Sequence, residues 1–190
     1  MHPSNRPALD TATAWWDGCM PTTRATRRRG PLTALEGAEP AVAIGDTTAR
    51  HVRLSPDGLS RHIGDPRSQF VPWSQVHTVT VDPPATWWPY PAMSDMAAAL
   101  LGGVAGGLEA GEAAETPTFL VVITTLDGER LEWRATQHYL SGYRRGDAQA
   151  TTRLVEYLTA RGEARMLLAR PAELIDRISA LTRIGPQIGP

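Results

Sequence analysis

Two short alternating segments joined by a Ser-Pro-Asp-Gly turn constrain the fold of this chain more than any other feature. The first segment is 52–54, the turn occupies 55–58, and the second segment begins at Leu59. An Asp-Gly pair between alternating segments is the strongest short-range signal for a β-hairpin, because the tightest hairpin turns require positive φ at both central residues. The sequence therefore predicts two paired strands with Asp57 and Gly58 at the turn.

The length of this turn determines which side chains lie opposite each other. A four-residue turn places His51 opposite His62 on the outer face of the hairpin, whereas a two-residue turn pairs His62 with Arg53. Either pairing leaves the histidines on the surface. A catalytic zinc ion needs three protein ligands, and no third candidate lies nearby in the sequence. We therefore expect neither a metal ion nor another cofactor.

A second hairpin follows later in the chain. Residues 118–125 are rich in β-branched side chains, and Asp127-Gly128 separates them from another alternating run, 129–136. In that run Leu131 and Trp133 are expected to face the core.

The chain between the two hairpins contains a further strand pattern and a long insertion. Apolar and polar residues alternate over 70–81, and Pro72 within this run indicates a sheet edge or a bend between two short strands. Residues 82–117 are too many for an ordinary connection. The aromatic residues of this insertion lie among prolines and are the best candidates for a partner-binding surface. They are Trp87, Trp88 and Tyr90.

The N-terminal residues 1–38 have no sustained strand or helix period, so we expect a flexible tail before a single domain over 39–184 and a short tail over 185–190. Trp15 and Trp16 are further candidates for partner binding, because large aromatic pairs rarely stay in solvent. The arginines of the N-terminal tail are candidates for contact with phosphate groups or with an acidic partner. They are Arg24, Arg27, Arg28 and Arg29.

The C-terminal third is predicted to be helical. Apolar residues at helical spacing indicate one helix over 147–161, with Asp147 as its N-cap, and another over 171–184, with a proline at its first position. Residues 164–169 between them are expected to form a short strand or a link.

The charged residues exclude several function classes. All 19 basic residues are arginine. The absence of lysine excludes a phosphate-binding Gly-Lys-Ser/Thr loop, a Schiff-base lysine, a Ser-x-x-Lys nucleophile and a protein-kinase site. The formal net charge of −1 provides no global attraction to nucleic acid or to an anionic membrane. Any such binding must be local.

Cys19 is the only cysteine, which excludes an intrachain disulfide bond and a thiolate metal cluster. No apolar stretch near the N-terminus resembles a signal sequence. The apolar run 96–108 is shorter than the roughly 20 residues that a membrane-spanning helix needs. We therefore expect a cytoplasmic protein without a transmembrane segment.

Several motifs between residues 48 and 161 belong to one pattern. They are the Ser-Pro-Asp-Gly-Leu turn, a Val-Pro-Trp-Ser-Gln-Val strand start at 71–76, the later hairpin and a closing helix. Together they resemble the bacterial pleckstrin-homology-like (PH-like) domain family. The resemblance implies an α+β fold, with a small antiparallel β-barrel or two-sheet core capped by C-terminal helices, and a binding role. The insertion and the last helix depart from the minimal pattern.

Three functions follow from these features. The leading hypothesis is a non-enzymatic PH-like interaction module that binds a protein partner or self-associates through the aromatic insertion, and a sheet edge near Pro72 offers a second route by strand addition. The alternative is peripheral membrane or nucleic-acid binding through the arginine cluster. The third is an enzyme with an unrecognised site, although no Gly-x-Ser-x-Gly motif supports it.

Overall fold

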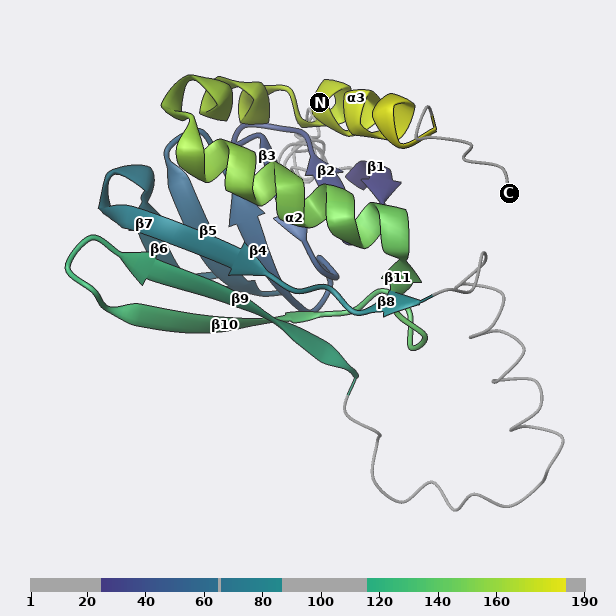
Figure 1. The fold of residues 1–190 in the computed structure, drawn as a ribbon, viewed down its shortest axis with the longest axis horizontal. Coiled ribbons are helices and arrows are strands. Elements are labelled where there is room, and N and C mark those ends of the chain that lie inside the picture. The colour runs from purple at the N-terminus through teal and green to yellow at the C-terminus, as the bar shows by residue number, and fades with distance from the viewer. Residues whose placement is uncertain (1–24, 65, 87–115, 184–190) are drawn as a thin grey trace, which may run out of the picture.

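The computed structural model describes residues 25–64, 66–86 and 116–183, which form a mixed α+β structure with two antiparallel sheets (Figure 1). The larger sheet is a meander of six strands in chain order. Its strands are β1 (Ala25–Arg29), β2 (Leu32–Leu35), β3 (Ala41–Ile44), β4 (Arg50–Leu54), β5 (Gly58–Ile63) and β6 (Arg67–Pro72).

The second sheet has three strands in the order β10-β9-β7. They are β7 (Val76–Val81), β9 (Thr118–Thr125) and β10 (Arg130–Thr136), and a short parallel pair joins β8 (Ala85–Thr86) to β11 (Tyr143–Arg144). Helical segments complete the fold: the 3-10 turns η1 (Trp73–Gln75) and η2 (Gly162–Ala169), and the helices α2 (Arg145–Ala160) and α3 (Pro171–Arg183).

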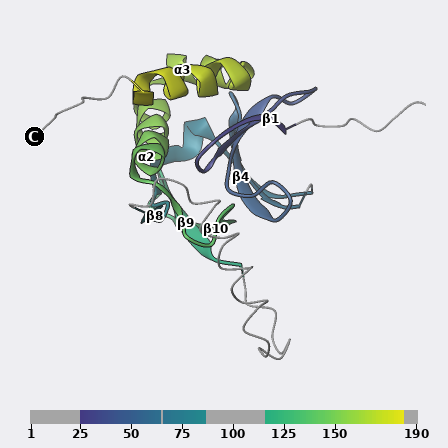
Figure 2. The same ribbon diagram turned by 90° about the vertical axis from the view of Figure 1, so that its right-hand side faces the viewer.

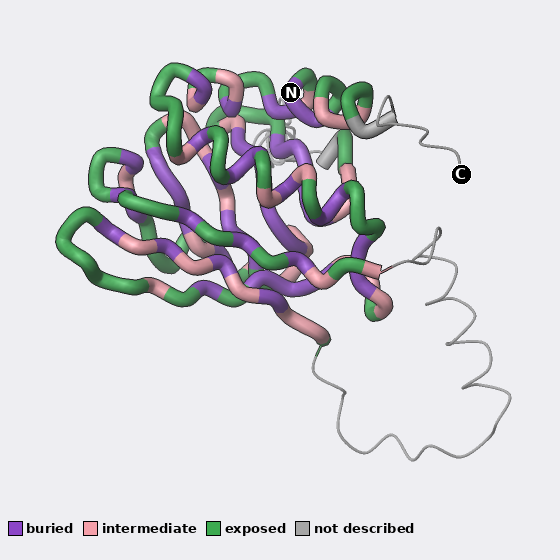
Figure 3. Tube along the Cα trace, viewed as in Figure 1, coloured by how far each residue is buried: buried purple, intermediate pink, exposed green. Residues whose placement is uncertain are grey.

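The two sheets and α2 enclose one apolar core. Figure 2 shows α2 on one side and the large sheet on the other, with α3 lying across the top. Along α2, buried and exposed residues alternate at helical spacing, and its apolar stripe contacts the core (Figure 3). The largest core side chains are Trp73 and Trp133, which are 4% and 1% exposed. The expected two-sheet core with C-terminal helices is confirmed.

The expected closed barrel is wrong for the described part of the chain. The sheets meet where the β3–β4 turn approaches the end of β10. There the Asp46 amide donates to the Thr136 carbonyl (2.9 Å), and the Arg50 amide donates to the Thr136 hydroxyl (3.3 Å). These are isolated bonds and not a continuous ladder, so the sheets remain separate.

The expected tail boundary at residue 38 is also wrong. The structure places 25–29 and 32–35 in the large sheet, and Leu32 and Ala34 are fully buried. All four residues of β2 and of β3 are buried, so neither strand shows the alternation that marks a half-exposed strand. Short strands that are buried on both faces therefore lack the alternation from which a strand is predicted. Residues 1–24 lie outside the described residues.

The first hairpin forms as predicted but with a different turn. Leu54 pairs with Leu59, which confirms the four-residue alternative, and Gly58 does not have positive φ. Instead, the Ser55 amide and hydroxyl both donate to the Gly58 carbonyl, at 2.9 and 3.1 Å. Glycine is needed here for space, because a Cβ would lie 2.4 Å from the Val71 carbonyl oxygen.

The other strand predictions are largely confirmed. β9 and β10 pair in register across the turn at Gly128, whose φ is +88°, and Trp133 faces the core. Pro72 ends β6 at the edge of one sheet, and η1 then leads the chain into the other sheet. Pro72 therefore marks both an edge and a bend.

The two predicted helices are present, and each begins and ends within two residues of its predicted bounds. Asp147 lies in the first turn of α2 and is not its N-cap, a position that Arg144 occupies without a side-chain bond. Residues 162–169 form a 3-10 helix and neither a strand nor a simple link. None of the described helices has the length and apolar character needed to cross a membrane.

Candidate functional site

The structure describes only part of the predicted site. Of the predicted partner-binding and phosphate-contact residues, those that lie outside the described residues are Trp15, Trp16, Arg24, Trp87, Trp88 and Tyr90. Their proposed role in partner binding or anion contact remains a prediction.

The three described arginines of the N-terminal cluster contact the body of the domain. Arg29 Nε donates to Asp147 Oδ1 (2.6 Å) in a pair that is largely buried. Arg28 donates to the Tyr139 hydroxyl (3.1 Å), with its guanidinium 5.4 Å from the ring centroid.

Arg27 forms an ion pair with Asp176 on α3, where both side chains are about half exposed. Together with the contacts of Arg28 and Arg29, this pair ties β1 to three other parts of the fold. The arginines from Arg27 to Arg29 are therefore structural, whatever else they bind.

Four strands form the outer edges of the two large sheets, and three of them are covered. α3 packs on β1, α2 packs on β7, and β10 packs against β4. β6 differs, because among the described elements it packs extensively only on β5. Four of its six residues are exposed. β6 is therefore the sheet edge that the described part of the chain leaves open.

A β-bulge shapes the side chains of this edge. Arg61 pairs with Gln69, but the next residue of β5, His62, pairs with Arg67, so Ser68 is the extra residue. The Ser68 hydroxyl donates to the Arg61 carbonyl (3.1 Å) and holds the bulge. Without it, Arg67 and Phe70 would project from opposite faces, because they are three residues apart.

The bulge therefore brings Arg67 and Phe70 together on the outer face of the sheet. The Arg67 guanidinium lies 5.4 Å from the Phe70 ring centroid, and the ring is 43% exposed. Such a contact between a cation and an aromatic face is favourable. The edge strand presents an aromatic anchor beside a positive charge.

A polar cleft of about 280 Å³ runs from this pair across the neighbouring strands. Its lining mixes both charge signs with hydroxyl groups and small residues. The lining residues are Glu39, Ala41, Arg53, Ser55, Ser60, His62, Arg67 and Phe70. They come from β3 to β6 and the adjoining turns, so the cleft lies directly beside the open edge.

One of the lining residues, His62, is stacked on a second histidine, His51. His51 and His62 lie opposite each other, as the four-residue turn predicts, with ring centroids 5.0 Å apart and planes at 18°. The expectation that they lie exposed on the surface is wrong, since they are 0% and 4% exposed. Arg53 Nε donates to His51 Nε2 (3.0 Å), so that nitrogen is an acceptor. The ring proton is therefore on Nδ1, which faces the Ala49 carbonyl (3.3 Å).

Burial keeps His51 neutral. Desolvation, helped by the charges of Arg53 and His62, lowers the pKa of His51 to about 4. A neutral His51 fixes the orientation of Arg53 at physiological pH, because only the neutral ring can accept its hydrogen bond.

The cleft contains a hydroxyl group close to an imidazole ring. The Ser60 hydroxyl lies 3.0 Å from His62 Nε2, the distance of a nucleophile and a base. His51 contacts His62 through stacked ring faces. Within the described ranges, no group of three metal-ligating side chains is present. The arrangement offers hydrogen bonds and charge, which suit binding.

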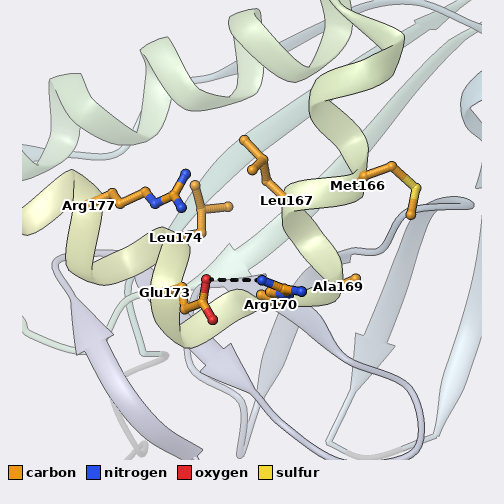
Figure 4. Close-up of a pocket in the computed structure, with 7 residues that line it drawn as sticks. All are labelled: Met166, Leu167, Ala169, Arg170, Glu173, Leu174 and Arg177. Carbon is orange, nitrogen blue, oxygen red and sulfur yellow. Dashed lines mark ion pairs between the residues drawn. The ribbon is translucent and has the colours of Figure 1, made fainter.

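A second cavity of about 390 Å³ lies between η2 and α3 (Figure 4). Leu167 and Leu174 point into it, while Arg170 and Glu173 at its rim form an ion pair with 3.8 Å between their charged atoms. Arg177 is the other charged residue of the lining. The cavity is mainly apolar and lacks the several converging polar groups of the cleft beside β6.

Comparison with known proteins adds no family: no family model, curated protein or solved structure matches this chain. The functional interpretation therefore depends on the geometry. The sequence predicts a sheet edge at Pro72 but does not predict the cleft. The predicted pairing of His51 with His62 is the one feature of the sequence that points to it.

Proposed function

We propose that this chain is a non-enzymatic PH-like interaction module that binds an extended segment of a protein partner as an added strand at β6. The observation that carries the proposal is the contrast among sheet edges. β6 is the one edge in the described structure without an extensively packed neighbour on its outer side. Main-chain groups at such an edge can pair with a further strand, which gives affinity without requiring a particular sequence.

The side chains of β6 support this role. Natural sheets protect exposed edges with charge, proline or bulges. β6 has a bulge at Ser68 and a proline at its end, yet Phe70 remains accessible in its second half. An accessible aromatic beside a cleft is a typical anchor of protein interfaces. The bulge and the proline therefore limit the length of edge that can pair with another strand, while Phe70 remains exposed for a side-chain contact.

The order of elements supports the PH-like part of the proposal. A meander of strands is followed by a second sheet and then by α2, which packs against the shared core. β1 and α3 extend this arrangement at one side, where α3 packs on β1 and β2. β6 lies at the other end of the large sheet, away from these additions.

The alternative of anion binding through the arginine cluster has less support. Arg27, Arg28 and Arg29 each have a partner within the domain. Binding a phosphate would require these contacts to be shared or broken. We therefore place the interaction surface at β6.

Selection from a displayed library of random linear peptides on the full chain, followed by hydrogen exchange of the complex, tests the proposal. We expect selected peptides to protect the amides of β6. N-methylation of alternate peptide amides should abolish binding, because it removes the donors of the added strand. Protection of β6 that grows with protein concentration alone would identify a second copy as the occupant. Protection confined to another element would contradict the proposal.

A matched pair of variants separates the anchor from general surface effects. Phe70 and Tyr157 are 43% and 44% exposed, and each has an arginine 5.4 Å from its ring centroid. We expect Phe70→Ala to weaken peptide binding about tenfold or more, since it removes the aromatic beside the added strand. Tyr157→Ala, on α2, should leave the affinity unchanged. Equal effects of the two substitutions would contradict a site at β6.

A further inference from the structure

We propose that the cleft beside β6 binds the carboxylate of an acidic residue in the added strand, so that the module selects acidic peptides. This inference rests on the proposed strand addition and specifies the chemistry of its partner. Its basis is the convergence of two arginines from different strands on one cleft, Arg53 from β4 and Arg67 from β6.

The charge balance of the cleft favours an anion. Among the described residues that line it, the charged side chains other than histidine are two arginines and one glutamate, Glu39. Arginine presents a planar fork of donors that matches a carboxylate. Because Arg53 and Arg67 approach from separate strands, a carboxylate between them interacts with both.

The orientation of Arg53 is fixed before a ligand arrives. Its Nε donates to the buried, neutral ring of His51 (3.0 Å), which is itself stacked on His62. A side chain held in this way loses less freedom when it binds. The Ser60 hydroxyl lies on the same cleft, 3.0 Å from His62 Nε2, and adds a polar group next to the arginines.

The bulge sets where the acidic residue must lie in the peptide. Arg67 and Phe70 project from the outer face of the sheet. Side chains of an added strand alternate between faces, and those opposite β6 lie about 5 Å away. Only outer-face positions of the peptide can reach the cleft. The preference for an acidic residue should therefore recur with a period of two residues and be absent at the positions between.

The test uses acetylated and amidated synthetic versions of a peptide selected on the full chain, with affinity measured by titration. We expect an Asp or Glu at an outer-face position, and its replacement by Asn or Gln should weaken binding roughly tenfold. Moving the acidic residue by one position should cause a similar loss. A preference that disappears without amidation would show that a terminal carboxylate replaces the side chain.

Variants of the protein identify the cleft as the source of the preference. In Arg53→Gln and Arg67→Gln, the acidic peptide and its amide counterpart should bind with equal affinity, whereas Arg161→Gln, at the residue that follows α2, should keep the preference. Raising the salt concentration should weaken only the acidic peptide. If selected peptides protect β6 but show no acidic preference, the carboxylate inference fails while strand addition stands. If no peptide protects β6, both fail.

Discussion

β1 and β6 are the two outermost strands of the same sheet, and they differ in their contacts with the rest of the described chain. β1 is tied down by Arg27 and Arg29, which reach α3 and α2, and by Arg28, which reaches Tyr139. In β6, by contrast, Arg67 contacts Phe70 of the same strand. One edge is closed by tertiary contacts, and the other has an exposed aromatic side chain and, among the described elements, packs extensively only on β5.

The comparison shows that the composition of a strand does not decide its availability. β1 contains three consecutive arginines, which suggest an exposed basic surface, yet these side chains hold the fold together. β6 contains an exposed phenylalanine, which suggests a core residue, yet it lies at the open edge. The position of each strand relative to the helices determines its role.

The largest expected effect concerns the closed edge. Asp147 is 9% exposed and pairs with Arg29, so Asp147→Ala leaves a largely buried guanidinium without its carboxylate. We expect the free energy of unfolding in urea to fall by about 3 kcal/mol. Arg27→Ala should lower it by less than about 1 kcal/mol, because that pair is half exposed. Equal losses would show that β1 is not held mainly by the buried pair.

A smaller effect is expected at the open edge. Gly58→Ala places a methyl group 2.4 Å from the Val71 carbonyl oxygen and 2.8 Å from the Phe70 ring, so β6 must shift. We expect a loss of about 2 kcal/mol and faster hydrogen exchange in β6. Gly146→Ala is the control, because its new methyl group would face open space. Unchanged exchange in β6 would show that close packing at Gly58 does not position the edge.

The smallest effect depends on pH and involves one histidine near each edge. Burial lowers the pKa to about 4 for His51 beside the cleft, and burial with the charge of Arg28 does the same for His138. Each ring has an ordinary pKa of 6.5 when unfolded, so its stabilisation is complete above that pH. It is lost as the pH falls from 6.5 towards 4.

Urea unfolding of the original chain and of two histidine variants, each at pH 7 and pH 5, measures the contribution of each histidine to this loss. We expect the free energy of unfolding to fall by on the order of 1–2 kcal/mol for each histidine. His51→Gln and His138→Gln should each remove one part of the decrease. If the decrease is the same in both variants and in the original chain, other groups cause it.

Much of the fold follows from local patterns. The alternation of Val52 and Leu54, the run from 118 to 125, and the apolar stripe of α2 each describe an element that buries one face. For such elements the spacing of the apolar residues predicts which side chains point inward. Pro72 likewise marked the edge, because proline cannot donate to a central ladder.

The candidate site follows from local patterns only in part. The bulge at Ser68 depends on a bond from its hydroxyl to Arg61, seven residues away in the neighbouring strand. The neutrality of His51 depends on burial and on Arg53. No single stretch of sequence contains these pairs of residues, so no periodicity reveals them.

The hairpins, the helices and the exclusion of lysine chemistry follow from the amino-acid sequence alone, because each of these depends on residue type and on spacing along one segment. The role of Arg27–Arg29 in stabilising the domain, and the lack of an extensively packed outer neighbour for β6 among the described elements, emerge only when the chain is folded. The physical reason is that burial and pairing are properties of side chains brought together from distant segments. Whether a strand lies at an exposed edge of a sheet depends on where the other strands and helices pack.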